Sequence, residues 1–126
     1  MQKVLMLLKW LPATFIVSCS WYLSSQPKLE HMPQFWNADK LVHCVCFAGL
    51  AFWVAFALGT GLKKIKRLSF PIVFVSVYGI IDEIHQSFIS GRSSSAFDWI
   101  FDTLGAIIGS LIFYGIVSIH SNIEEK

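Results

Sequence analysis

Charged residues are scarce in this sequence: they make up 14% of its 126 residues, whereas a typical soluble domain contains about 25%. Hydrophobic residues make up 55% and aromatic residues 15%. Long apolar stretches leave little sequence between them, which excludes an ordinary soluble domain. The net charge of +2 does not indicate nucleic acid binding, because membrane topology explains the basic residues better.

Cysteine is also rare, and the sequence does not predict a disulfide framework. Cys19, Cys44 and Cys46 all lie in apolar stretches, where we expect small packing side chains. Phosphate-binding glycine loops, a nucleophile elbow and a compact zincin-type His-Glu-x-x-His motif are absent. Histidine and carboxylates that can bind metal are present, but no spacing among them requires it. We therefore predict neither a metal nor another cofactor.

Four apolar stretches approach the roughly 20 residues that a helix needs to cross a bilayer. They cover residues 4–24, 40–62, 70–89 and 96–119. The sequence therefore predicts an all-α membrane protein, a bundle of four transmembrane helices in a single domain over residues 1–126.

The first stretch has an alternative interpretation as a cleaved signal peptide, because residues 16–19 are similar to a lipoprotein processing box. Lys9 and Pro12 interrupt its apolar run, however, and that run continues past Cys19 to Leu23. These features favour a retained transmembrane helix.

The short segment 63–67 contains four basic residues, which predicts a cytoplasmic loop by the positive-inside rule. Lys3 and Lys9 place the N-terminus on the same side. Four crossings return the C-terminus to the cytoplasm, so segments 26–38 and 90–95 must face outward. We expect a multi-pass protein of the cytoplasmic (inner) membrane.

This topology gathers the ionisable residues of the spans in the outer half of the membrane. They lie at the start of the second span, the end of the third and the start of the fourth. Ionisable groups within a membrane are costly and commonly mark functional sites. The candidates are Asp39, His43, Asp82, Glu83, Gln86, Arg92, Asp98 and Asp102.

Helical spacing suggests how several of these side chains are directed. Asp39 and His43 are four residues apart, so Asp39 could orient the imidazole or simply favour the helix N-terminus. Asp82 shares a face with Gln86, whereas Glu83 points about 100° away. We expect Asp82 to enter the bundle and Glu83 to face a neighbouring helix or the interface. Gln86 could equally make a structural hydrogen bond between helices.

The turn after the third span offers a second set of roles. Gly91 permits a positive φ, and Arg92 could bind a phosphate or carboxylate, or form a salt bridge to Glu83 or Asp98. Ser95 and Asp98 match a capping box. Asp102 lies one turn deeper than Asp98, where it needs a partner such as Arg92, His43 or Asp82.

Gly105 and Gly109 form a small-x-x-x-small pattern, which allows helices to pack closely. We expect this surface either inside the bundle or at a homodimer contact.

Four segments in order resemble the VanZ-like family. They are Tyr22-Leu23-Ser24-Ser25-Gln26-Pro27, Asp39-Lys40-x-x-His43, Asp82-Glu83-x-x-Gln86-x-Phe88-x-x-Gly91-Arg92 and Asp98-x-x-x-Asp102-x-x-Gly105. Two positions depart from the family pattern: Ser90 replaces a common proline, and Asp102 a common asparagine. The resemblance implies a small integral membrane protein, with resistance to the glycopeptide teicoplanin associated with the family's namesake.

Three functions and a structural alternative follow. The first is a cell-envelope accessory factor that binds a membrane lipid or lipid-linked cell-wall precursor through Asp39, Glu83, Gln86, Arg92 and Asp98. The second is an intramembrane hydrolase or phosphotransferase acting on a lipid head group. Its general base would be Asp82 or Asp102 and its general acid His43. The third is a small proton-coupled transporter, and the alternative is a purely structural polar core.

Overall fold

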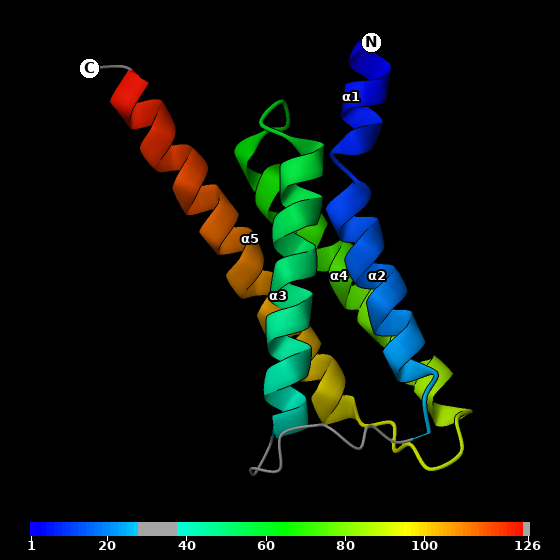
Figure 1. Cartoon of the computed structure of the whole chain (residues 1–126). Helices are drawn as coiled ribbons and strands as arrows, with labels where there is room; N and C mark the ends of the chain where they lie inside the picture. The colour runs from blue at the N-terminus through cyan, green and yellow to red at the C-terminus, as the bar shows by residue number, and fades with distance from the viewer. Residues whose placement is uncertain (28–37, 125–126) are drawn as a thin grey trace.

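The computed structural model describes residues 1–27 and 38–124, and within them all regular structure is helical. The helices are α1 (Gln2–Leu8), α2 (Leu11–Ser24), α3 (Ala38–Leu58), α4 (Lys64–Ser87) and α5 (Ala96–Glu124), shown in Figure 1. Four spans among the described residues are long and apolar enough to cross a membrane. The predicted all-α, four-span fold is therefore confirmed.

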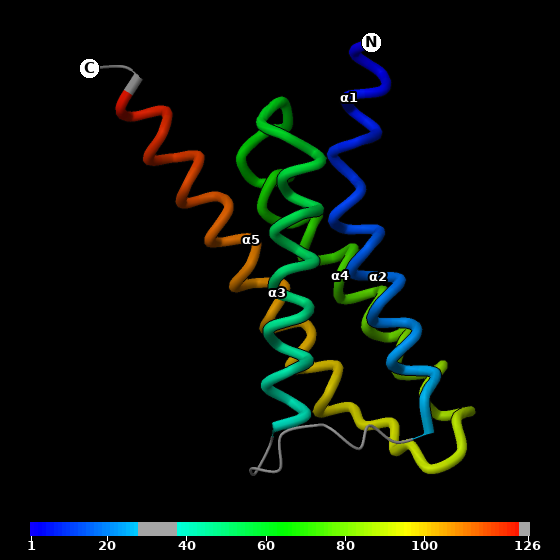
Figure 2. Tube along the Cα trace, in the orientation of Figure 1, coloured from blue at the N-terminus to red at the C-terminus, as the bar shows by residue number. Residues whose placement is uncertain are grey.

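The first span consists of two helical pieces. Lys9 and Trp10 interrupt it, and Pro12 lies in the first turn of α2, where its missing N–H costs no hydrogen bond. Residues Gln2–Ser24 still form one 23-residue span. In Figure 2 the trace of α1 continues into α2 with only a local break.

The helix boundaries differ from the prediction around the basic segment. The second span ends at Leu58 rather than at residue 62, because Gly59 adopts a positive φ of 70°. Most of the basic residues then belong to α4, which begins at Lys64. The final helix also extends beyond residue 119, to Glu124.

The contact between α3 and α5 is the most extensive in the bundle, and two glycines make it possible. A Cβ atom on Gly105 would overlap the carbonyl oxygen of Cys44, and one on Gly109 that of Ala48. Both glycines therefore serve close packing within a single chain, the first of their two expected roles. A homodimer stays a prediction, and it would have to use another surface.

The distribution of apolar and polar side chains over the bundle is that of a membrane protein. Large apolar side chains such as Phe15, Val73 and Ile116 are 54–70% exposed, as lipid-facing residues should be. The centre is lined by small and medium apolar residues, including Leu50, Val54 and Val75. Most of the buried polar side chains lie near one end.

The two ends of the bundle differ. Figure 1 places the start of α1, the end of α5 and the α3–α4 connection at one end. The end of α2, the start of α3, the end of α4 and the start of α5 lie at the other, which we call the polar end. The start of α1 and the end of α5 therefore lie at the same end of the bundle, and the cytoplasmic location of both termini stays a prediction.

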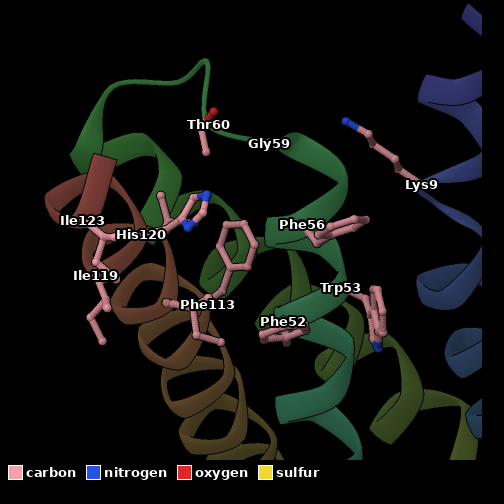
Figure 3. A pocket seen from close by; sticks show the side chains of 12 residues that line it. Lys9, Phe52, Trp53, Phe56, Gly59, Thr60, Phe113, Ile119, His120 and Ile123 are labelled. Atoms are coloured by element: carbon pink, nitrogen blue, oxygen red, sulfur yellow. The ribbon is translucent and has the colours of Figure 1, made fainter. Parts of the chain in front are cut away.

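At the end opposite the polar end, α5 diverges from α3 (Figure 1) and leaves a cavity of about 830 Å³. Figure 3 shows its lining, which is mostly aromatic and aliphatic, as at Phe52, Phe56 and Phe113, and also includes the polar side chains of Lys9, Thr60 and His120. The rings of Phe52 and Phe56 each meet Phe113 edge-on. This apolar cavity is separate from the polar residues considered below.

Candidate functional site

Polar side chains from all four spans meet in one layer at the polar end. Three of the spans supply side chains that are at least nine-tenths buried, and α3 supplies His43, which is partly buried. The buried members are Ser20, Ser24, Asp82, Glu83, Gln86, Asp98 and Asp102. The described structure thus gathers the predicted site residues from distant parts of the sequence into a single region.

His43 and Asp102 join α3 to α5. His43 Nδ1 lies 2.9 Å from Asp102 Oδ1, and Asp102 is fully buried. Asp102 Oδ2 is buried without a hydrogen-bond partner. It lies against the backbone of α4, because a Cβ on Gly79 would be only 3.0 Å from it. The carboxylate that orients the imidazole is therefore Asp102, rather than the sequence neighbour Asp39.

Asp82 joins α4 to α2. Its Oδ2 accepts hydrogen bonds from Ser24 Oγ and from Gln86 Nε2, both at 2.9 Å. Gln86 Nε2 also lies 3.3 Å from Ser24 Oγ, so it bonds both within and between helices. Asp82 Oδ1 is buried without a partner. Asp82 enters the bundle as predicted, whereas Ser24 was not predicted as a site residue.

Glu83 is buried too, and it joins α4 to the start of α5. Its Oε2 accepts a hydrogen bond of 2.9 Å from the backbone N–H of Ser95, and its Oε1 has no partner. Ser95 Oγ in turn accepts from the N–H of Phe97, as a helix cap does. The predicted capping box is therefore wrong in its second half, because Glu83 and not Asp98 takes the Ser95 N–H.

Asp98 is instead part of an ion-pair group with α3. Lys40 Nζ lies 3.3 Å from Asp98 Oδ1 and 3.1 Å from Asp39 Oδ2. The carboxylate of Asp98 is nearly buried, whereas that of Asp39 is half exposed. Lys40 was not among the predicted site residues, although it stands between two of them.

Arg92 reaches from the α4–α5 turn to the end of α2. Gly91 has a φ of 81°, as predicted, and Arg92 Nη2 donates to the carbonyl oxygen of Leu23 at 3.4 Å. Arg92 Nε is buried without a hydrogen-bond partner. Within residues 1–27 and 38–124 no ion pair joins Arg92 to Glu83 or Asp98, so the salt bridge, one of the two roles considered for Arg92, is not formed.

A small pocket of about 60 Å³ connects three of these groups. Asp82, His43 and Arg92 all line it, from α4, α3 and the α4–α5 turn. Leu23 and Val42 also line it, and both are more than 40% exposed on the apolar outer surface. At about 30 Å³ for each water, the volume accommodates two waters or one small polar group.

Sequence reasoning also missed contacts around His85. Its ring stacks on Trp21 at 4.0 Å between centroids, and its Nε2 lies 2.9 Å from Ser25 Oγ. Ser24 and Ser25 both lie in the segment that carries the family resemblance at the end of the first span. The family resemblance of this segment is the sequence feature that could have pointed to these serine residues as part of the site. Residues 28–37, which include most of the predicted outer loop 26–38, lie outside the described residues.

The structure also brings possible metal ligands together, although we predicted no metal site from the sequence. One ring nitrogen of His43 and one carboxylate oxygen each of Glu83 and Asp102 lie within 4.8 Å of one another.

Comparison with known proteins places the chain by its sequence. No curated protein and no solved structure matches it significantly. The VanZ/LLP1 family matches over residues 2–118, which includes every site residue described above. The chain therefore belongs to the VanZ/LLP1 family.

Proposed function

We propose that this small multi-pass membrane protein binds the polar head of an amphiphilic molecule at the polar end of the bundle. The observation that carries the proposal is the pocket lined by Asp82, His43 and Arg92 together with the exposed apolar residues Leu23 and Val42. Polar and charged lining residues beside lipid-facing side chains suit a molecule with one polar end and one apolar end.

The charges of the pocket suggest which polar groups it binds. Arg92 has a buried Nε without a partner, and a guanidinium matches the oxygens of a phosphate. Asp82 Oδ1 is free to accept a hydrogen bond from a hydroxyl or amine. A head group that carries a phosphate together with a hydroxyl or amine, as in a lipid-linked phosphate or cell-wall precursor, can bond to both Arg92 and Asp82. The small volume means that the rest of the molecule lies outside, among the lipids.

In the cell, we propose that the protein lies in the cytoplasmic membrane with its site in the outer half. The basic residues at the opposite end support this orientation. Its role would be that of a cell-envelope accessory factor, which lowers the access of teicoplanin to the cell envelope by binding or altering the lipid. The sequence resemblance supports this last step, and a change in teicoplanin susceptibility on expression in a sensitive bacterium tests it.

Native mass spectrometry of the protein released gently from its own membrane tests the binding. Wild type should carry a discrete lipid or prenyl phosphate adduct, and Arg92→Ala should lose it. Lys66→Ala is the matched control, since it removes an exposed cation at the opposite end and should keep the adduct. A wild type without any adduct, or equal loss in both variants, contradicts the proposal.

An intramembrane hydrolase or phosphotransferase is the second candidate, favoured by the pair between His43 and Asp102. An imidazole at 2.9 Å from a buried carboxylate, in the same pocket as Asp82, supplies the side chains that acid–base catalysis uses. Appearance of a cleaved lipid in wild type, but not in His43→Ala, would support this candidate over simple binding.

A proton-coupled transporter receives less support from the fold. Between the polar layer and the other end, the described core residues Leu50, Ala51, Val54 and Val75 are apolar and almost completely buried, and Ser110 on α5 adds a single buried hydroxyl. A transport path through one chain would need polar groups or water there.

A further inference from the structure

Beyond the binding of an amphiphile, we infer that His43, Glu83 and Asp102 form a site for a divalent transition metal of the Zn²⁺ class. The three residues come from α3, α4 and α5, and one possible ligand atom from each lies within 4.8 Å of the other two. Imidazole nitrogen and carboxylate oxygens are common ligands of zinc. Three protein ligands would leave a position open for water or substrate.

The free oxygen atoms of the two carboxylates point to a ligand. Asp102 is completely buried and Glu83 is 6% exposed, yet Asp102 Oδ2 and Glu83 Oε1 have no hydrogen-bond partner. Buried carboxylate oxygens are costly when unpaired, because they have lost water without gaining another donor. A cation between them removes this cost at both atoms.

The second oxygen of each carboxylate is already held in place. Glu83 Oε2 accepts the Ser95 N–H at 2.9 Å, and Asp102 Oδ1 lies 2.9 Å from His43 Nδ1. The Ser95 contact is an outer contact of the kind that fixes the orientation of a metal ligand. The contact between His43 and Asp102 joins two proposed ligands, so the metal would replace the proton between them. Gly79, one turn before Glu83, leaves room for Asp102 Oδ2 beside α4. Glu83 is therefore oriented before the metal binds, and His43 and Asp102 already lie side by side.

The charge of the layer also matches a divalent cation. Four carboxylates are nearly or fully buried: Asp82, Glu83, Asp98 and Asp102. Among the described residues of the layer, Lys40 and Arg92 are the permanent cations. The half-exposed Asp39 shares Lys40 with Asp98, so three negative charges remain when His43 is neutral, which is its state as a metal ligand. One divalent ion offsets two of them.

Binding requires a small movement of the side chains. Zinc bonds of about 2.0–2.2 Å place tetrahedral ligand atoms about 3.4 Å apart. The present separations extend to 4.8 Å, so at least one side chain must shift by roughly 1 Å. Glu83 Oε1 would break no hydrogen bond in such a shift.

Metal analysis of the full chain, purified without a polyhistidine tag or chelator, tests the inference. Wild type should retain about one Zn²⁺ per chain after free metal is removed, and Glu83→Gln and Asp102→Asn should weaken Zn²⁺ binding at least tenfold. Asp82→Asn is the matched control. It neutralises an adjacent buried carboxylate that also has an unpartnered oxygen, but it lies outside the three ligands, so it should weaken Zn²⁺ binding far less than Glu83→Gln does.

Titration of wild type with CoCl₂ gives a second measurement that does not depend on the folding of any variant. Visible ligand-field bands that ZnCl₂ abolishes are expected. Their absence in excess Co²⁺, or equal loss of zinc in Asp82→Asn and Glu83→Gln, would overturn the inference. The lipid adduct is tested through Arg92, which is not a ligand, so the two proposals can fail separately.

Discussion

Replacing Gly109 with alanine should push α5 away from α3 and destabilise the protein. The added Cβ would overlap the carbonyl oxygen of Ala48 and lie 2.8 Å from its carbonyl carbon and 3.0 Å from its Cα. All three atoms belong to the backbone, so no side-chain rotation can relieve the contact. The helices must separate instead.

The magnitude follows from two opposing effects. Overpacking in a tight core costs about 1–3 kcal/mol, and a backbone contact lies at the upper limit, about 3 kcal/mol. Alanine favours a helix over glycine by about 1 kcal/mol, which leaves a net loss of about 2 kcal/mol in the free energy of unfolding. Gly115→Ala on the same helix meets nothing within 4 Å and should gain about 1 kcal/mol instead.

Unfolding in detergent, followed by tryptophan fluorescence, measures both variants against wild type. The two alanine variants should differ by about 3 kcal/mol, which is the cost of the contact alone. Gly109→Ala should also weaken the pairing of His43 with Asp102, because these residues stand on the two helices that separate. Equal stability of Gly109→Ala and Gly115→Ala would refute the close packing of α3 on α5.

Three further predictions concern the polar end and the topology. Lys40→Met should cost about 2 kcal/mol in thermal unfolding, because it leaves the nearly buried Asp98 unpaired, and adding Asp98→Asn should restore most of this loss. Ser95→Ala should cost about 1 kcal/mol in the same assay, because it removes the cap of α5. In a background without native cysteines, Ser93→Cys should react with an impermeant maleimide in intact cells, and Gly61→Cys only after lysis.

Each of these predictions has an outcome that contradicts it. If the double variant at Lys40 and Asp98 is no more stable than Lys40→Met alone, the ion pair is not the cause of the loss. An unchanged melting temperature in Ser95→Ala would show that the cap is unimportant. Labelling of Gly61→Cys rather than Ser93→Cys in intact cells would invert the topology.

The spans and their polar layer could be predicted from sequence because both depend on local properties. Hydropathy and length define the spans, and helix length places His43, Asp82 and Asp102 at similar depth. The early end of α3 could also have been predicted from sequence, because glycine commonly terminates helices and Gly59 directly follows Leu58.

The pairings inside the layer could only be narrowed to alternatives, with His43 one of three possible partners for Asp102, because spacing gives the face of a helix but not the neighbour that it meets. Asp39 shares a face with His43, yet the crossing of α3 and α5 brings Asp102 to the imidazole instead. The capping box failed for the same reason: Glu83 approaches Ser95 from another helix and replaces the local partner Asp98.

Site-specific photo-crosslinking tests the central claim, that the pocket at the polar end binds an amphiphile, most directly. A benzophenone side chain introduced by Leu23→p-benzoylphenylalanine stands at the pocket, and the same substitution at Phe15 stands on the exposed surface of the same helix. Irradiation in native membranes should attach one defined amphiphile at position 23 but not at 15, and Arg92→Ala should abolish that product. The same mixture of bulk lipids at both positions, unaffected by Arg92→Ala, would contradict the claim.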